Sequence, residues 1–180
     1  PEVNRTTLQI ADLPVFLAGD ANAETPLLHE AADDGHIAGI NATQPKVTCY
    51  ARRTPLAIVF AEPGVAMVGD RFSTLNLATC ITSEVDFSYQ GRAMASQRNT
   101  GLIRLYASTQ EGRLLGAEMC APAAEHMAHL LALAIDQALT VHEMLRMPFY
   151  HPVLEEGLRT ALRGLAKQLP TTTGFDLAHC

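Results

Sequence analysis

The sequence lacks the marks of a membrane protein, an exported protein or a nucleic-acid-binding protein. None of its apolar runs is long enough to span a bilayer, and the first ten residues, PEVNRTTLQI, do not show the charged-then-apolar order of a signal peptide. The 13 lysines and arginines are scattered apart from one Arg52-Arg53 pair, and the formal net charge is −6. An acidic chain without a basic cluster disfavours nucleic acid as a partner. We therefore expect binding neither to membranes nor to nucleic acid.

The sequence also lacks any local cysteine motif. Its cysteines form no C-x-x-C or C-x-x-x-x-C pair, which argues against a local redox motif or a zinc knuckle. These cysteines are Cys49, Cys80, Cys120 and Cys180. His126 and His129 have the i,i+3 spacing of metal ligands, but no carboxylate or cysteine completes a ligand set, so we expect no metal site. Free thiols are typical of cytoplasmic proteins, and this is the localisation we expect.

What the chain does have is enough apolar sequence for a packed core. Hydrophobic residues make up 48% and charged residues 18% of the 180 positions, which suits one domain plus part of another. Residues 13–20, LPVFLAGD, predict a short buried strand that ends in a Gly-Asp turn. Residues 26–43 predict a helix, with Thr25 as its cap and Pro26 at its first position.

The remaining residues predict a second, larger domain. Two prolines and the basic pair in TQPKVTCYARRTP indicate a boundary, so that residues 1–45 form one piece, 50–170 a domain and 171–180 a tail. Strand patterns occupy 56–61, 64–69, 84–89, 101–108 and 113–121, the last two forming an antiparallel hairpin. Helices are expected over 122–139, 140–147 and 152–169, the second with a Thr140–Glu143 capping box. The predicted fold class is α+β, an antiparallel sheet flanked by helices and preceded by a strand-helix remnant.

The stretch FYHPVLEEGLRTAL contains a histidine and a glutamate that are five residues apart. On a continuous helix these two side chains would diverge, but the residue before a proline avoids the helical region. We therefore expect Pro152 at the first helical position, His151 at the cap and Glu156 about one turn in, where the imidazole can reach it. A carboxylate in that place would suit an acid/base histidine, although a histidine that only caps or packs would give the same spacing.

A second candidate site lies at the turn before the first helix. Asp20 follows the expected strand, and the helix that starts near Pro26 presents unpaired N–H groups. Such a turn can bind a ligand's hydroxyl and carbonyl groups. An aspartate that merely caps a loop gives the same pattern.

Four stretches together resemble one enzyme family. LPVFLAGDANAETPLLHEAADDGHIAG resembles the second flavin-binding motif of the pyridine nucleotide–disulfide oxidoreductases. PLAIVFAEPGVAMVG, GLIRLYASTQEGRLLGAEMCAPAAEHMAHLLALAI and MPFYHPVLEEGLRTAL resemble successive parts of that family's C-terminal dimerisation domain. The resemblance runs in order over nearly the whole chain and is strongest to the dihydrolipoamide dehydrogenases.

The resemblance implies a role for each candidate residue. Asp20 would bind the ribityl chain of FAD, and Leu27, Leu28 and His29 would line the isoalloxazine ring. His151 would be the acid/base that handles the dithiol's protons, oriented by Glu156, and would act on the other subunit of a homodimer. The helix around 130–135 would contribute to the isologous interface. NAD would be the cosubstrate, and a 2-oxo acid dehydrogenase complex, reached through its lipoyl domains, is the expected partner.

The departures from the family pattern are also informative. The two Gly-rich fingerprints for FAD and NAD and the redox-active C-x-x-x-x-C are absent, so we expect the C-terminal part of a longer enzyme that is inactive alone. Val153 stands where the family often has threonine, and His29 where the lipoamide enzymes often have alanine. Mercuric reductases lack the histidine, which argues against them, whereas glutathione reductases share the pair. The alternatives are a glutathione-reductase-like enzyme or a homodimerisation module without chemistry.

Overall fold

The computed structural model describes residues 2–170 and 176–177. The chain divides into two compact units, residues 1–53 and residues 54–180. The boundary lies a few residues beyond the predicted one, because the basic pair belongs to the first unit. Arg52 pairs there with Glu30 at 2.6 Å and Arg53 with Asp33 at 3.0 Å. Most of the predicted tail over 171–180 lies outside the described residues.

The first unit contains a 3-10 helix, η1 (Gly19–Asn22), and the helix α1 (Leu28–Thr43). The strand predicted over 13–20 is wrong: Phe16 forms only an isolated bridge to Gln9, and Leu13 and Val15 are 54% and 48% exposed. A strand needs a neighbour that pairs along its length, and the described part of this unit supplies none. The apolar run alone therefore could not make a strand.

The start of α1 also differs from the prediction. Leu27, with an extended backbone, precedes the first helical residue Leu28, so Thr25 is not the cap and Pro26 is not in the helix. The Leu27 N–H donates to the Thr25 carbonyl at 2.8 Å, which makes a tight turn around Pro26. This turn delays the helix by two residues. It also places Leu27 at the helix start, where the resemblance expects a ligand contact.

The second unit is built on one antiparallel sheet, which confirms the predicted fold class. Its strand order is β1-β2-β5-β4-β3. The strands are β1 (Leu56–Val59), β2 (Gly64–Gly69), β3 (Cys80–Asp86), β4 (Leu102–Ser108) and β5 (Leu114–Ala121). The β4–β5 hairpin forms as predicted, with Leu105 opposite Ala117. The third strand was expected over 84–89 but ends at Asp86, whose side chain accepts the Ser88 N–H at 2.7 Å and caps a 3-10 helix.

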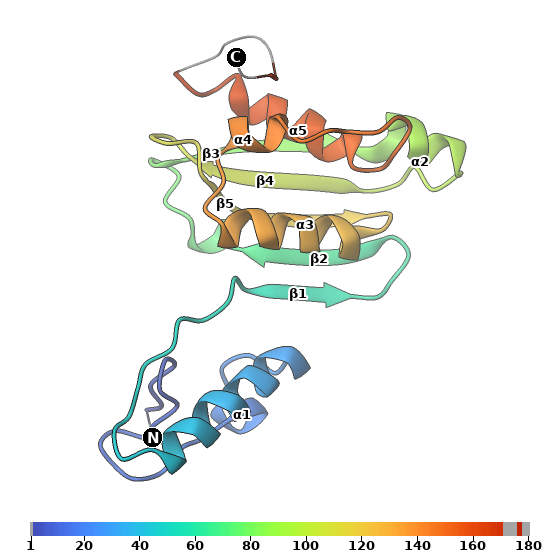
Figure 1. Cartoon of the computed structure of the whole chain (residues 1–180). Coiled ribbons are helices and arrows are strands. Elements are labelled where there is room, and N and C mark those ends of the chain that lie inside the picture. The colour runs from blue at the N-terminus through green and yellow to red at the C-terminus, as the bar shows by residue number, and fades with distance from the viewer. Residues whose placement is uncertain (1, 171–175, 178–180) are drawn as a thin grey trace. The chain divides into compact units, whose positions relative to one another are not determined.

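Two helices pack on this sheet and a third packs on one of them (Figure 1). Helix α3 packs on β2 and β5, α5 packs on β3 and β4, and α4 packs on α5. The helical segments of the unit are η2 (Phe72–Thr74), η3 (Phe87–Tyr89), α2 (Gly91–Ala95), α3 (Ala124–Asp136), α4 (Val141–Leu145) and α5 (Glu156–Ala166). The Thr140–Glu143 capping box at the start of α4 is present. None of the helices in the described part of the chain is long and apolar enough to cross a membrane.

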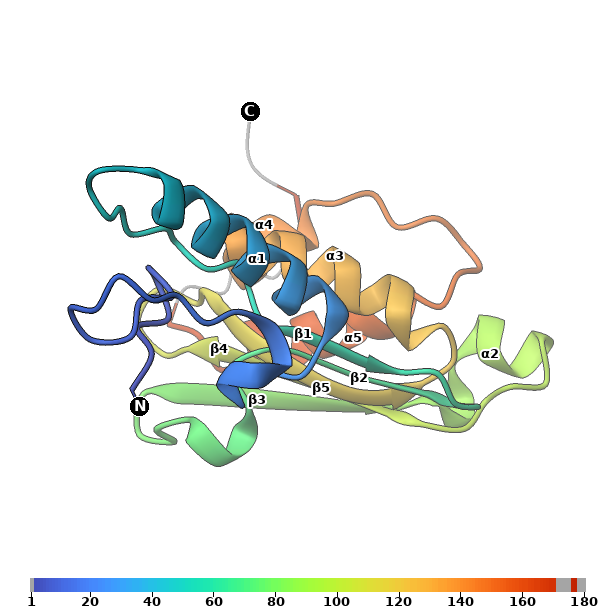
Figure 2. The same cartoon turned by 90° about the horizontal axis from the view of Figure 1, so that it is seen from below.

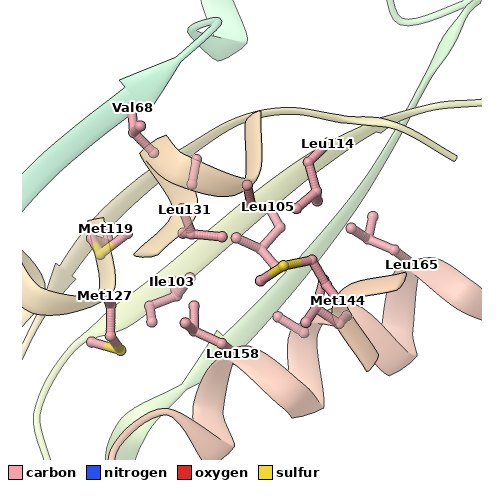
Figure 3. Packing of buried hydrophobic residues seen from close by; sticks show 14 of the residues in the cluster. Val68, Ile103, Leu105, Leu114, Met119, Met127, Leu131, Met144, Leu158 and Leu165 are labelled. Carbon is pink, nitrogen blue, oxygen red and sulfur yellow. The ribbon is translucent and has the colours of Figure 1, made fainter. Parts of the chain in front are cut away.

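The core of the second unit lies between the sheet and these helices. Alternate residues of β4, namely Ile103, Leu105 and Ala107, are fully buried. Figure 3 shows Ile103 and Leu105 among side chains from α3 and α5, including Leu131 and Leu158. Because residues two apart in a strand share a face, one face of the sheet is apolar and packs under the helices. The intervening Arg104 instead pairs with Glu84 on the neighbouring strand β3.

Candidate functional site

The loop between α4 and α5 brings the predicted histidine and glutamate together. The Nδ1 atom of His151 lies 2.9 Å from Oε1 and 3.1 Å from Oε2 of Glu156. The same carboxylate accepts the backbone N–H of Val153 at 3.2 Å. One carboxylate therefore contacts both the imidazole and the backbone of the loop that carries it.

The local structure that makes this contact differs from the prediction. Helix α5 begins at Glu156 and not at Pro152, and Glu155 is the preceding cap residue. His151 is consequently not a helix cap. Residues 154 and 155 form a turn in which the Gly157 N–H donates to the Leu154 carbonyl at 2.9 Å. The five-residue separation is bridged because the loop folds back onto the first helical residue.

The geometry defines which nitrogen of His151 is available. An ionised carboxylate only accepts hydrogen bonds, so Nδ1 is the atom that donates and Nε2 of the neutral ring keeps a free lone pair. The His151 side chain is 79% exposed, whereas that of Glu156 is 27% exposed. The hydrogen bond from His151 is the main cause that holds the pKa of the Glu156 carboxyl below its ordinary value. The pair thus presents a proton acceptor at the molecular surface.

The residues of the second candidate site lie at or next to the start of α1. Asp20 is in η1 and is exposed, Leu27 precedes α1, and Leu28 and His29 are its first two residues. Leu28 is 88% exposed, which is unusual for a leucine. In the described part of the chain no side chain caps the N-terminus of α1. Its first N–H groups therefore remain available to an external acceptor.

A buried aspartate that the sequence analysis did not single out anchors the turn that presents Asp20. Asp34, in α1, is 5% exposed, and its Oδ2 accepts the Gly19 N–H at 3.0 Å and the Asn22 amide at 2.8 Å. The Arg52 guanidinium lies 2.7 Å from its Oδ1. The available signal was helical spacing, because Asp34, Ile37 and Asn41 share the buried side of α1.

Neither site contains a recognisable metal centre. Among residues 2–170 and 176–177, no group of three His, Cys, Asp or Glu side chains is arranged to hold a metal ion. His129 instead places Nδ1 2.6 Å from the Glu125 carbonyl of its own helix.

Comparison with known proteins gives the family. Residues 56–162 match the family model described as the pyridine nucleotide-disulphide oxidoreductase dimerisation domain. The dihydrolipoyl dehydrogenase of Haloferax volcanii is 28% identical over 150 residues, which cover 82% of this chain and 31% of that protein. The mercuric reductase of Acidithiobacillus ferrooxidans is 29% identical over 157 residues, which cover 86% and 28% of the two chains. The chain thus spans about a third of the length of such relatives.

Solved structures share the fold. LpdA from Mycobacterium tuberculosis has a TM-score of 0.77 and 27% identity, with 91% of this chain and 36% of that chain covered. RclA from Escherichia coli, described as an HOCl-induced flavoprotein disulfide reductase, has a TM-score of 0.75 at 19% identity, with 90% and 38% covered, a likeness of fold alone. With a family match over more than half of its length, this chain belongs to the pyridine nucleotide-disulphide oxidoreductases.

Proposed function

We propose that this chain is the C-terminal part of an FAD- and NAD-dependent enzyme of the dihydrolipoamide dehydrogenase type, acting in the cytoplasm. The observation that carries the proposal is the contact between His151 Nδ1 and the Glu156 carboxylate, on an imidazole that is 79% exposed. In the neutral ring this contact makes Nε2 the proton acceptor. Oxidation of a dithiol requires a base that removes a thiol proton, and a carboxylate-oriented imidazole is suited to this step.

The proposed role of His151 is proton handling at Nε2. A substrate dithiol that closes to a disulfide releases two electrons and two protons; both electrons and one proton end in NADH, and the other proton goes to solvent. Nε2 takes one thiol proton as the sulfur becomes nucleophilic, and the imidazolium later passes that proton to water. Glu156 keeps Nδ1 protonated throughout and stabilises the transient positive charge. When bound to the complete enzyme, FAD supplies the two-electron transfer between the dithiol and NAD.

We propose that a second protomer completes the site. The His151 side chain is 79% exposed and would act on sulfur chemistry supplied by the longer enzyme. The match of residues 56–162 to a dimerisation domain supports a homodimer in which each His151 serves its partner. Leu133, on the outer side of α3, is 62% exposed, in keeping with an interface along this helix. In a two-fold dimer both sites are completed at once.

The first unit fits part of an FAD site. An isoalloxazine ring would cover the exposed Leu28, and its polar edge would accept hydrogen bonds from the uncapped N–H groups at Leu28 and His29. Asp20 is exposed on a turn anchored by Asp34, so its carboxylate would be open to a ribityl hydroxyl. The rest of the FAD site would come from the longer protein, and we propose that the 180-residue chain alone neither binds FAD tightly nor turns over substrate.

We propose that the substrate is a dithiol of the lipoamide type. The relatives include NAD(P)H dehydrogenase (quinone) from Mycobacterium tuberculosis, 28% identical over 169 residues that cover 92% of this chain and 34% of that protein. Sequence identity therefore does not decide whether the substrate is a dihydrolipoamide, a mercuric ion or a quinone. The His151–Glu156 pair favours a dithiol, because mercury and quinone reduction need no thiol base. A lipoyl domain of a 2-oxo acid dehydrogenase complex would be the macromolecular partner.

The experiment is to measure dihydrolipoamide-dependent NAD reduction in the full-length protein and in its His151→Gln variant. General acid/base catalysis contributes about 10² to 10⁴ in rate, so turnover should fall by that factor. A glutathione disulfide assay run beside it tests the related glutathione-reductase-like activity. Near-normal lipoamide turnover in the variant would refute the role of His151, whereas absence of turnover in the full-length wild type would favour a homodimerisation module without chemistry.

A further inference from the structure

The loop that carries His151 is held by a residue far away in sequence. Gln90 Nε2 donates a hydrogen bond to the Val153 carbonyl oxygen at 2.7 Å, and Gln90 is only 9% exposed. Its Oε1 accepts the Ala93 N–H at 2.7 Å. Because a backbone N–H can bond only to the oxygen of the amide, this second contact fixes the amide's orientation. Gln90 therefore presents its NH₂ group, the donor that a carbonyl requires, to Val153.

Val153 is consequently held from two sides. Its N–H donates to the Glu156 carboxylate at 3.2 Å, while its carbonyl accepts from Gln90. Val153 is two residues beyond His151, and the bond to Gln90 holds its carbonyl, in the peptide that joins Val153 to Leu154. The Val153 N–H belongs to the preceding peptide, which shares the Val153 Cα. If Val153 turned away, the carboxylate would lose its backbone donor and its alignment with Nδ1.

The segment that carries Gln90 is itself firmly placed. Phe87 is fully buried, and its N–H donates to the Gly101 carbonyl at 2.9 Å. The Asn99 amide donates to the Ser88 carbonyl at 2.8 Å. A Cβ on Gly157 would lie 2.6 Å from Phe87 Cζ, so the first turn of α5 rests directly on this ring. Both views show α2 and the loop before α5 at the same end of the sheet (Figures 1 and 2).

We propose that Gln90 is a positioning residue for the His151–Glu156 pair. By holding the Val153 carbonyl, Gln90 keeps the Glu156 carboxylate in contact with Nδ1. This contact favours the Nδ1-protonated tautomer of the His151 ring, in which Nε2 carries no proton. The geometric part of this inference stands on the contacts alone, whereas its effect on turnover rests on the proposed function. Loss of one such hydrogen bond corresponds to a decrease in rate of about threefold to tenfold.

The direct test uses the 180-residue chain with ¹⁵N-labelled histidine at pH about 8.5, where a histidine side chain is ordinarily neutral. The ¹⁵N shifts of His151 report which ring nitrogen carries the proton. We expect the Nδ1-protonated tautomer to dominate in the wild type and to lose population in Gln90→Met. The matched control is Gln168→Met, because Gln168 Nε2 also donates to a backbone carbonyl, that of Thr82 at 2.8 Å, at the other end of α5.

A second variant covers the case in which Gln90→Met fails to fold. Gln90→Glu keeps an oxygen for the Ala93 N–H but, when ionised, cannot donate to Val153, so it should lower the same tautomer population. Equal tautomer populations in the wild type and in both folded Gln90 variants would overturn the inference.

The kinetic test separates this inference from the proposed function. In the full-length enzyme, Gln90→Met should lower kcat about threefold to tenfold, and this loss should vanish when His151→Gln is also present. Gln168→Met should leave kcat unchanged. If His151→Gln leaves turnover normal while Gln90→Met still shifts the tautomer, the proposed function fails and the positioning role stands. If His151→Gln slows turnover while Gln90→Met behaves like Gln168→Met in both assays, the positioning role is refuted.

Discussion

The close approach of α5 to Phe87 gives a prediction whose size follows from the structure. An alanine at Gly157 would place its Cβ 2.6 Å from Phe87 Cζ and 3.0 Å from Cε2, closer than carbon atoms pack. Phe87 is fully buried, so its ring has no free space into which to move. Overpacking of this kind costs about 1–3 kcal/mol, and the better helix propensity of alanine returns at most about 1 kcal/mol. Gly157→Ala should therefore lower the free energy of unfolding by up to about 3 kcal/mol.

The chain provides a matched control for this substitution. Gly91 is also in the first turn of a helix in the same unit, and a Cβ there would meet no atom within 4 Å. Gly91→Ala should leave the free energy of unfolding unchanged or raise it by about 0.4–1 kcal/mol. Urea unfolding of both variants, followed by circular dichroism and extrapolated to water, measures the difference. A Gly157→Ala protein as stable as Gly91→Ala would show that the packing of α5 on Phe87 is wrong.

Two further predictions concern single carboxylates. Because hydrogen bonding to His151 lowers the pKa of Glu156, its ionised form stabilises the fold above the unfolded-state pKa, and this gain is lost as the pH falls through the folded-state pKa. The stability difference between the wild type and Glu156→Gln should thus be present at neutral pH and shrink below pH about 4; a difference unchanged in acid would contradict the linkage. Asp34→Ala leaves the Gly19 N–H and the Asn22 amide without their acceptor and removes one of the two carboxylates on the half-buried Arg52. It should destabilise the first unit by about 1–3 kcal/mol, seen as faster hydrogen exchange at Gly19. Asp33→Ala, at an exposed pair, should cost at most about 1 kcal/mol, and equal effects of the two would refute the distinction.

Local signals in the sequence predicted the elements that depend on neighbouring residues. The capping box at Thr140 and the β4–β5 hairpin around Gly112 formed because each is determined within a few residues. The strand over 13–20 failed because a strand also depends on a partner that the pattern cannot guarantee. The start of α5 was placed four residues too early because a proline can equally stand in the turn that leads to a helix.

The candidate site shows the same division between local and distant contacts. His151 and Glu156 could be paired from their spacing, although the loop closes on the first residue of α5 and not across a helix cap. No sequence pattern predicts the contact of Gln90, because its partner Val153 is 63 positions away and is contacted through the backbone. Every residue has a backbone carbonyl, so a side chain that binds one does not restrict which residue stands at that position. Such contacts become visible only when the chain is folded.

The His151 imidazole is highly exposed, so the residue proposed to carry the chemistry takes little part in the packing of the domain. The ring is not part of the sheet-and-helix core, so replacing it should remove the proposed proton acceptor at little cost in folding beyond its hydrogen bond to Glu156. One nucleotide change in this codon would then yield an intact subunit that still assembles with active ones. If each His151 serves its partner as proposed, such subunits in a mixed population would impair the active centre of their partner and leave their own in working order.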